Sequence, residues 1–214
     1  MRMSRRGLLG LSGVAMLGAA GRSPAADLGR TPAQTLGPFY PIEKPLDRDA
    51  DLTLIRGRKQ RAAGQVIHVL GRVLDARGNP VSGARIEIWQ ANAHGRYTHP
   101  NDRNPQPLDP NFEGYANLET DAEGRYRFKT IKPGGYPAGA GASRPPHIHF
   151  DVKGRLSRLV TQMYFAGEPL DDDAIFMATS REFRQLLVAD VGKPTADLEP
   201  DSLLARWDIV LERG

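Results

Sequence analysis

Short stretches in which apolar and polar residues alternate recur along the chain after residue 65. Residues 125–131 (Arg-Tyr-Arg-Phe-Lys-Thr-Ile) alternate most regularly, and residues 84–90 repeat with the same period. Because successive side chains of a strand point to opposite faces, this period predicts strands with one buried face. Further segments of strand length that are rich in apolar residues are 66–70, 73–74, 147–152, 159–165 and 206–211.

Turn-forming residues separate these segments. The chain has 23 glycines and 17 prolines, and residues 75–80 (Asp-Ala-Arg-Gly-Asn-Pro) have the composition of a tight turn. Phe183, Leu186 and Leu187 have helical spacing. One or two short helices are therefore expected between residues 171 and 188.

Two long segments, 91–120 and 132–146, follow neither period. Irregular segments of that length in a compact domain commonly carry function. Short strands joined by turns predict an all-β fold, with a β-sandwich core, long active-site loops and one or two short helices. We expect this domain to span residues 66–214, after an N-terminal arm at residues 27–65.

The N-terminal 26 residues have the layout of an export signal. Arg5 and Arg6 precede an apolar run from Gly7 to about Ala20, and small residues follow at 23–26. The run is shorter than the roughly 20 residues that a membrane span requires, so no stable span is expected. The arginine pair favours the twin-arginine route and a periplasmic or secreted location. An ordinary export signal that holds two arginines is the alternative.

Composition narrows the possible chemistry. Four arginines and no acidic residue lie in the N-terminal 26 residues, and subtracting them from the 29 lysines and arginines leaves 25, against 25 acidic residues. The remaining chain is therefore near neutral and has no electrostatic footprint for nucleic acid. The absence of cysteine excludes disulfides, cysteine nucleophiles and thiolate metal sites.

His147 and His149 form a His-x-His pair on a predicted strand. Residues i and i+2 of a strand share a face, so both imidazoles can reach one metal ion, while Ile148, Phe150 and Val152 face the core. Pro145-Pro146, directly before the pair, favours an extended entry into the strand. The alternative is two hydrogen-bonded histidines on a polar sheet face.

Two histidines do not complete a metal site, and without cysteine the other ligands must be Asp, Glu, Tyr, another His or water. Phenolate is a hard anionic donor that suits an ion such as Fe(III), which displaces the phenol proton. Tyr97 and Tyr136 both lie at loop starts next to glycine. Taken singly, each tyrosine fits a half-buried packing role better than a ligand role.

Five stretches, in this order, resemble the intradiol ring-cleavage dioxygenases. The resemblance covers about residues 30–176. The length of the chain favours the protocatechuate branch, because the catechol and hydroxyquinol branches carry an added N-terminal helical region that this chain lacks. The matching stretches are Thr31–Pro41, Gly83–Tyr97, Asp109–Tyr115, Thr120–Gly134 and Arg144–Phe150.

The resemblance implies one non-haem Fe(III) per chain and cleavage of a catechol-type ring with O2 to a cis,cis-muconate. It assigns the iron to Tyr97, Tyr136, His147 and His149, with Tyr136 and His149 as the axial pair. It gives Arg144 the role of steadying negative charge on the substrate ring, and it places Gln162 near the site. The resemblance also implies that Tyr136 accepts a substrate proton. The arm residues that wall the pocket in this family match Thr35, Gly37, Pro38 and Tyr40.

Ala138 and Ser143 stand where the protocatechuate branch usually has tryptophan, in a loop that is two residues shorter. This difference predicts a more open rim and leaves protocatechuate, catechol, hydroxyquinol and larger catechols as possible substrates. The chain carries both the arm motif and all four ligands, so it needs no second type of subunit on this interpretation. A homo-oligomer is possible.

Two other interpretations stay open at this point. Residues 71–136 also resemble carboxypeptidase-regulatory or transthyretin-like β-sandwiches, which bind and do no chemistry. A cupin-like zinc or copper site would join the histidine pair to His94, His99 or a carboxylate. Glu87 and Asp151 are candidates for orienting the imidazoles. The acidic run at 171–173 suggests a helix start rather than a Ca²⁺ site.

Overall fold

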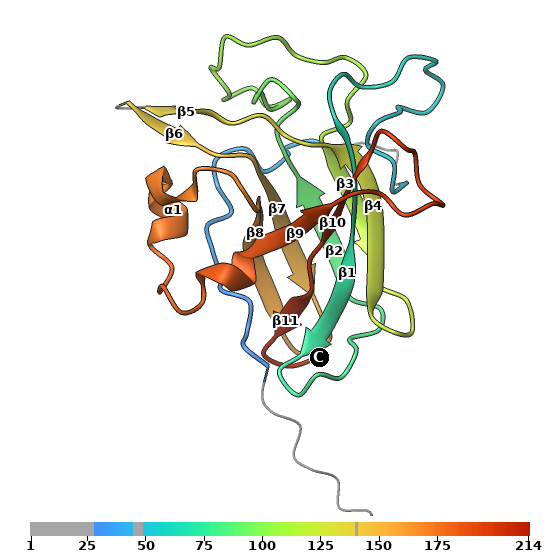
Figure 1. Cartoon of the computed structure of the whole chain (residues 1–214), viewed down its shortest axis with the longest axis vertical. Helices are drawn as coiled ribbons and strands as arrows, with labels where there is room; N and C mark the ends of the chain where they lie inside the picture. Colours follow the sequence, from blue (N-terminus) through green and yellow to red (C-terminus); the bar gives the residue numbers. More distant parts are fainter. Residues whose placement is uncertain (1–27, 45–48, 140) are drawn as a thin grey trace, which may run out of the picture.

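A computed structural model of the chain describes residues 28–44, 49–139 and 141–214 (Figure 1). The predicted signal peptide lies outside the described residues. No helix in the described ranges is long and apolar enough for a membrane span. The strands are β1 Val66–Asp75, β2 Arg85–Trp89, β3 Tyr115–Glu119, β4 Arg125–Ile131, β5 Tyr136–Gly139, β6 Ala142–Arg144, β7 His147–Lys153, β8 Arg158–Phe165, β9 Val188–Gly192, β10 Leu203–Arg206 and β11 Ile209–Leu211.

The main sheet has the order β11-β1-β10-β9-β8-β7-β2-β3, with β4 paired to β1, and it curves until it is nearly closed (Figure 1). This agrees with the all-β prediction. Strand β7 lies antiparallel between β2 and β8. In this register His149 lies opposite Trp89 on one side and Gln162 on the other. Directly opposite residues share a face, so these three side chains form one row across the sheet.

The interior holds the apolar face of β7, as the alternation predicts. Ile148, Phe150 and Val152 are fully buried in the core. The Phe150 ring lies 5.0 Å from that of Trp207 and 6.0 Å from that of Phe128. Because the core fixes one face of β7, the alternate residues His147 and His149 are held on the opposite face.

The helical segments are short, in agreement with the sequence. They are η1 Leu170–Asp172, α1 Ala174–Met177 and η2 Arg184–Leu187. Asp173 precedes α1, and its side chain accepts hydrogen bonds from the backbone N–H groups of Ile175 and Phe176. The acidic run therefore begins a helix, as expected.

Three local predictions were wrong. Residues 206–211 do not form one strand, because β10 ends at Arg206 and β11 begins only at Ile209. Between them, the carbonyl oxygen of Trp207 packs against Gly71, where a Cβ would lie 1.8 Å from that oxygen. The predicted loop at 91–120 ends in strand β3, and the loop at 132–146 contains the hairpin β5–β6. Strand β9 was not predicted.

The described part of the N-terminal arm is attached to the domain at several points. Thr31 N–H donates to the carbonyl of Val210, and Gln34 N–H donates to that of Val160 in β8, so the arm runs beside the sheet (Figure 1). Further along, Leu52 is fully buried in the core. These contacts place residues 34–40 over the histidine face of β7, where Gly37 meets His149.

Candidate functional site

The two histidines of β7 are buried neutral bases. Each is 2% exposed. Burial lowers the pKa of His147 to about 3 and that of His149 well below its usual range, with the Arg144 cation adding to both effects. His147 Nδ1 lies 2.7 Å from the carbonyl oxygen of Pro145, which can only accept, so Nδ1 carries the proton. His147 Nε2 therefore presents a free lone pair.

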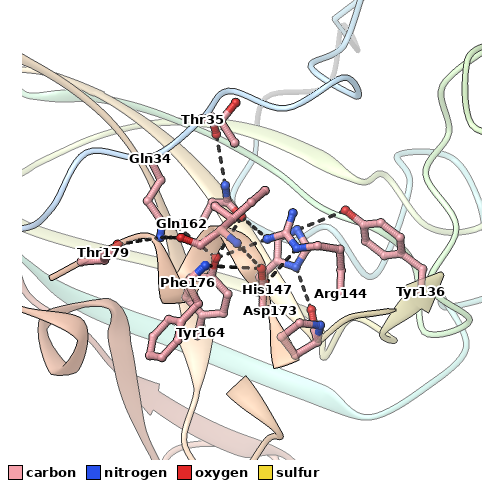
Figure 2. A network of polar contacts seen from close by, with 12 residues as sticks. Gln34, Thr35, Tyr136, Arg144, His147, Gln162, Tyr164, Asp173, Phe176 and Thr179 are labelled. Atoms are coloured by element: carbon pink, nitrogen blue, oxygen red, sulfur yellow. Dashed lines mark hydrogen bonds and ion pairs between the residues drawn. The ribbon is translucent and has the colours of Figure 1, made fainter. Parts of the chain in front are cut away.

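Two tyrosines approach this lone pair from separate loops. The hydroxyl oxygens of Tyr97 and Tyr136 each lie 3.4 Å from His147 Nε2. Tyr97 is buried in the loop after β2. Tyr136 begins β5, and its hydroxyl points toward His147 (Figure 2). Burial raises the pKa of Tyr97 well above its usual value, and it also raises that of Tyr136, where Arg144 partly offsets it.

Glycines allow the two tyrosine loops to touch. A Cβ on Gly134 would lie 2.5 Å from the carbonyl oxygen of Ala93, and one on Gly95 would lie 2.3 Å from that of Gly135. Gly95 also has a φ of 76°, a conformation that favours glycine. The loop contact is closed by a hydrogen bond from Gly134 N–H to the carbonyl of Asn92.

His149 completes the group from the next position on the same face of β7. Its ring lies 5.0 Å from that of His147 and stacks on Trp89 at 4.9 Å with an interplanar angle of 11°. Its buried Nδ1 has no hydrogen-bond partner among the described residues. Gly37 covers the ring, since a Cβ there would lie 3.1 Å from His149 Cε1.

The donor set fits a hard, multivalent cation. Two donor atoms that each lie about 2.1 Å from one ion at a tetrahedral angle are about 3.4 Å apart, which matches the spacing of the hydroxyls from His147 Nε2. Two phenols and two neutral imidazoles supply oxygen and nitrogen donors of this class. A bound cation would displace the phenol protons, which burial otherwise retains.

Arg144 lies beside this group in a buried polar network (Figure 2). Its Nε donates to Asp173 at 2.9 Å, and its Nη2 donates to Gln162 at 2.6 Å and to the hydroxyl oxygen of Tyr164 at 3.2 Å. Gln162 also donates to the carbonyl oxygen of Thr35 at 3.1 Å. The predicted residues Arg144 and Gln162 thus contact each other, and Gln162 also contacts the arm.

The other predicted arm residues lie at different distances from the group. Gly37 packs on His149, as described, whereas Pro38 is exposed. Tyr40 donates its hydroxyl proton to Glu87 and packs edge-on against Trp89, one side chain away from His149. The carbonyl oxygen of Thr35 accepts a hydrogen bond from Gln162, and its hydroxyl oxygen accepts one from the N–H of Gly37.

Several other sequence candidates lie elsewhere. Among the described residues, no third His, Asp or Glu joins the histidine pair, and His94 is exposed. The expectation that Glu87 and Asp151 orient the imidazoles is wrong, because Glu87 binds Tyr40 and Lys44, and Asp151 binds Arg158. The imidazole of His147 is instead oriented by a backbone carbonyl.

Comparison with known proteins decides the family. Residues 36–213 match the family model described as "Dioxygenase". The protocatechuate 3,4-dioxygenase beta chain of Burkholderia cepacia is 48% identical over 179 residues, which are 81% of this chain and 76% of that protein. The chain belongs to the intradiol dioxygenase family. It is therefore a ring-cleaving dioxygenase, and this assignment favours an enzyme over the binding-module interpretation.

Other intradiol dioxygenases are similar over a smaller share of their length. The hydroxyquinol 1,2-dioxygenase of Rhodococcus opacus is 33% identical over 75% of this chain and 55% of that protein. The structure of the mercury-inhibited catechol 1,2-dioxygenase from Acinetobacter sp. ADP1 superimposes with a TM-score of 0.65 at 29% identity, over 86% of this chain and 63% of that chain.

Sequence reasoning missed part of the network in this intradiol dioxygenase. Asp173 was assigned only to a helix start, and Tyr164 and Gln34 were not considered. Gln34 binds the carbonyl of Ile175 and the hydroxyl of Thr179 in the segment around α1, and it accepts a hydrogen bond from Tyr164 (Figure 2). The acidic run before an apolar segment was the available signal for Asp173, but its partner lies 29 residues away.

Proposed function

We propose that this intradiol dioxygenase cleaves a catechol-type ring, protocatechuate or a related catechol, between the two hydroxyl-bearing carbons. Both atoms of O2 enter the product, a cis,cis-muconate. One non-haem Fe(III) per chain is held by Tyr97, Tyr136, His147 and His149. The observation that carries the proposal is the convergence of two phenol hydroxyls at 3.4 Å on the free nitrogen of a buried, neutral His147.

The four side chains suit ferric iron in different ways. His147 and His149 are neutral and need lose no proton from their donor nitrogen. The two phenols become anionic ligands that offset the charge of the ion. Ferric iron, when bound, supplies the Lewis acidity that ionises a catechol at neutral pH and the redox chemistry that couples the ring to O2.

Tyr136 is the better proton acceptor of the two tyrosines. It is partly exposed, whereas Tyr97 is 3% exposed and sealed behind Phe39, whose ring lies 4.7 Å away. Since burial raises the pKa of Tyr136, a phenolate at this position would take up a proton readily. We assign to Tyr136 Oη the uptake of a catechol proton, while Tyr97 remains a fixed ligand.

Arg144 supplies a fixed positive charge next to Tyr136. With Nε bound to Asp173 and Nη2 bound to Gln162, the described residues leave its Nη1 group without a hydrogen bond. A guanidinium stays charged at any pH of interest, so it stabilises negative charge that develops on a ring held against the tyrosines.

The rim of the site bears on substrate choice. Ala138 and Ser143 lie on the hairpin β5–β6 and are exposed. We propose that this rim admits catechols larger than protocatechuate. We also propose that the arm makes each chain self-sufficient, alone or in a homo-oligomer, and that the twin-arginine pattern directs the protein to the periplasm or outside the cell.

The direct test is the product. The ferric protein would be incubated with catechol or protocatechuate under ¹⁸O2, and we expect a ring-opened dicarboxylic acid that carries two labelled oxygens. Tyr136→Phe should lower the rate at least tenfold, whereas Tyr126→Phe, which alters a buried tyrosine bound to the Trp207 carbonyl, should not. An aldehyde-containing product from cleavage beside the diol, or no product from iron-loaded protein, contradicts the proposal.

A further inference from the structure

A buried carboxylate, Asp173, connects helix α1 to Arg144. Its side chain is fully buried. Oδ1 accepts the N–H groups of Ile175 at 2.8 Å and Phe176 at 3.3 Å, and Oδ2 accepts the Arg144 Nε–H at 2.9 Å. The two oxygens thus have separate partners: one belongs to the start of the helix and the other to the guanidinium.

Capping alone does not require a buried charge at this position. Asn and Ser cap helices as well as Asp does, and neither brings the desolvation penalty of a carboxylate. Among the described residues, Oδ2 accepts no hydrogen bond from the helix, and its hydrogen bond is to Arg144. The negative charge is therefore explained by the guanidinium rather than by the helix.

The contact limits how Arg144 can be oriented. An arginine side chain has four rotatable bonds, and a hydrogen bond at Nε restrains the last of them in a way that a bond at Nη2 alone does not. With Gln162 and Tyr164 at Nη2, the guanidinium plane is fixed from two directions (Figure 2). The remaining amino group, Nη1, is then directed to one place.

We propose that Asp173 is a positioning residue for Arg144: its Oδ2 holds the guanidinium so that Nη1 faces the ring of a bound catechol. The helix N-terminus holds Asp173 in turn, because Oδ1 is fixed by two backbone N–H groups. Gln34 ties the same helical segment to the arm through Ile175 and Thr179. This inference rests on the proposed function for the part that Arg144 plays at the substrate.

The substitution Asp173→Asn separates the two roles, since Asn keeps the cap and loses the charge that faces Arg144. The first measurement is the ¹H–¹⁵N signal of Arg144 Nε–H in the metal-free protein, assigned by its loss in Arg144→Lys. We expect the signal of Asp173→Asn to shift and its hydrogen exchange to quicken at least tenfold. The neighbouring carboxylate Asp172 is exposed, so Asp172→Asn is the matched control and should leave the signal unchanged.

The second measurement is steady-state ring cleavage by the ferric protein. Asp173→Asn should lower kcat at least tenfold with a smaller change in KM, because Arg144 acts on charge that develops during the reaction. In the Arg144→Lys background, which lacks the Nε–H group, the same substitution should have less than a twofold effect. If Asp173→Asn does not fold, Asp173→Ser, which also retains a capping oxygen, takes its place.

An unchanged Arg144 signal in Asp173→Asn, or in Asp173→Ser where that variant takes its place, overturns the inference. An equal loss of kcat in the presence and absence of the Arg144 guanidinium also overturns it. If the ferric wild-type protein cleaves no catechol, the proposed function fails instead. In that case the Nε–H measurement on the metal-free protein still decides whether Asp173 positions Arg144.

Discussion

The contact between the two tyrosine loops predicts that Gly134→Ala disrupts the proposed metal site. A Cβ at position 134 would lie 2.5 Å from the carbonyl oxygen of Ala93 and 2.6 Å from the backbone nitrogen of Gly95. Ordinary contact begins near 3.4 Å, and 3.4 minus 2.5 gives a required separation of about 0.9 Å. Both neighbours are backbone atoms, so no side chain can simply rotate away.

That displacement is large compared with what a metal site accepts. Ligand distances in metal sites hold to about 0.2 Å, and Tyr136 lies two residues after the substitution. We expect the ferric affinity of Gly134→Ala to fall about 10- to 100-fold, the loss that is typical when the residues that orient ligands are changed. The free energy of unfolding should fall by about 1–3 kcal/mol, the usual cost of overpacking.

The assay is a titration of the metal-free protein with ferric ion against a competing chelator, followed by visible absorption. Gly192→Ala is the matched control, because its Cβ would meet nothing within 4 Å and its φ is not left-handed. The reasoning is refuted if Gly134→Ala binds ferric ion within twofold of Gly192→Ala, since the loop contact would then not set the ligand positions.

Two further predictions concern stability. Phe150→Ala removes a ring from the core behind the histidine face and should lower the free energy of unfolding by about 3–5 kcal/mol, or Tm by about 6–20 °C. Phe183→Ala, at a residue that is 41% exposed, should lower it by under about 1 kcal/mol. Comparable urea-unfolding midpoints for the two variants would mean that the strand faces are misassigned. The hydrogen bond from Lys129 is the main cause that lowers the pKa of Glu199 to about 2, below its value in the unfolded chain. Glu199 therefore contributes stability above about pH 4.3 that is lost as the pH falls toward 2. Thermal melts of Glu199→Gln from pH 6 to pH 3 should show a shallower decline than wild type, and parallel curves contradict this; the effect is small because the carboxylate is partly solvated.

Strands whose burial depends on local alternation were predictable. Strand β4 has the bounds that the alternation of residues 125–131 predicts, and β7 has the predicted core face. The break between β10 and β11 at Trp207 was not predictable, because it depends on contact with Gly71, 136 residues away in sequence. The hairpin β5–β6 has exposed residues on both faces and hence no apolar period that could mark it.

The residues of the candidate site likewise fall into those that a local pattern predicts and those that it does not. The His147 and His149 pair follows from the two-residue period of a strand, a local property. Tyr97 lies in the loop after β2 and Tyr136 begins β5, and only the resemblance to a family joined them to the histidines. The contact between Asp173 and Arg144 brings together a helix start and the end of a hairpin, and no local pattern records such a pairing.

The central claim, a ferric centre with two tyrosine and two histidine ligands, is tested most directly by the visible spectrum of the iron-loaded protein. Phenolate bound to Fe(III) gives a charge-transfer band, and anaerobic catechol should shift that band to longer wavelength. Tyr97→Phe and Tyr136→Phe should each weaken it, and the double variant should abolish it. A colourless wild-type protein that retains no iron after incubation with ferric salt would contradict the account.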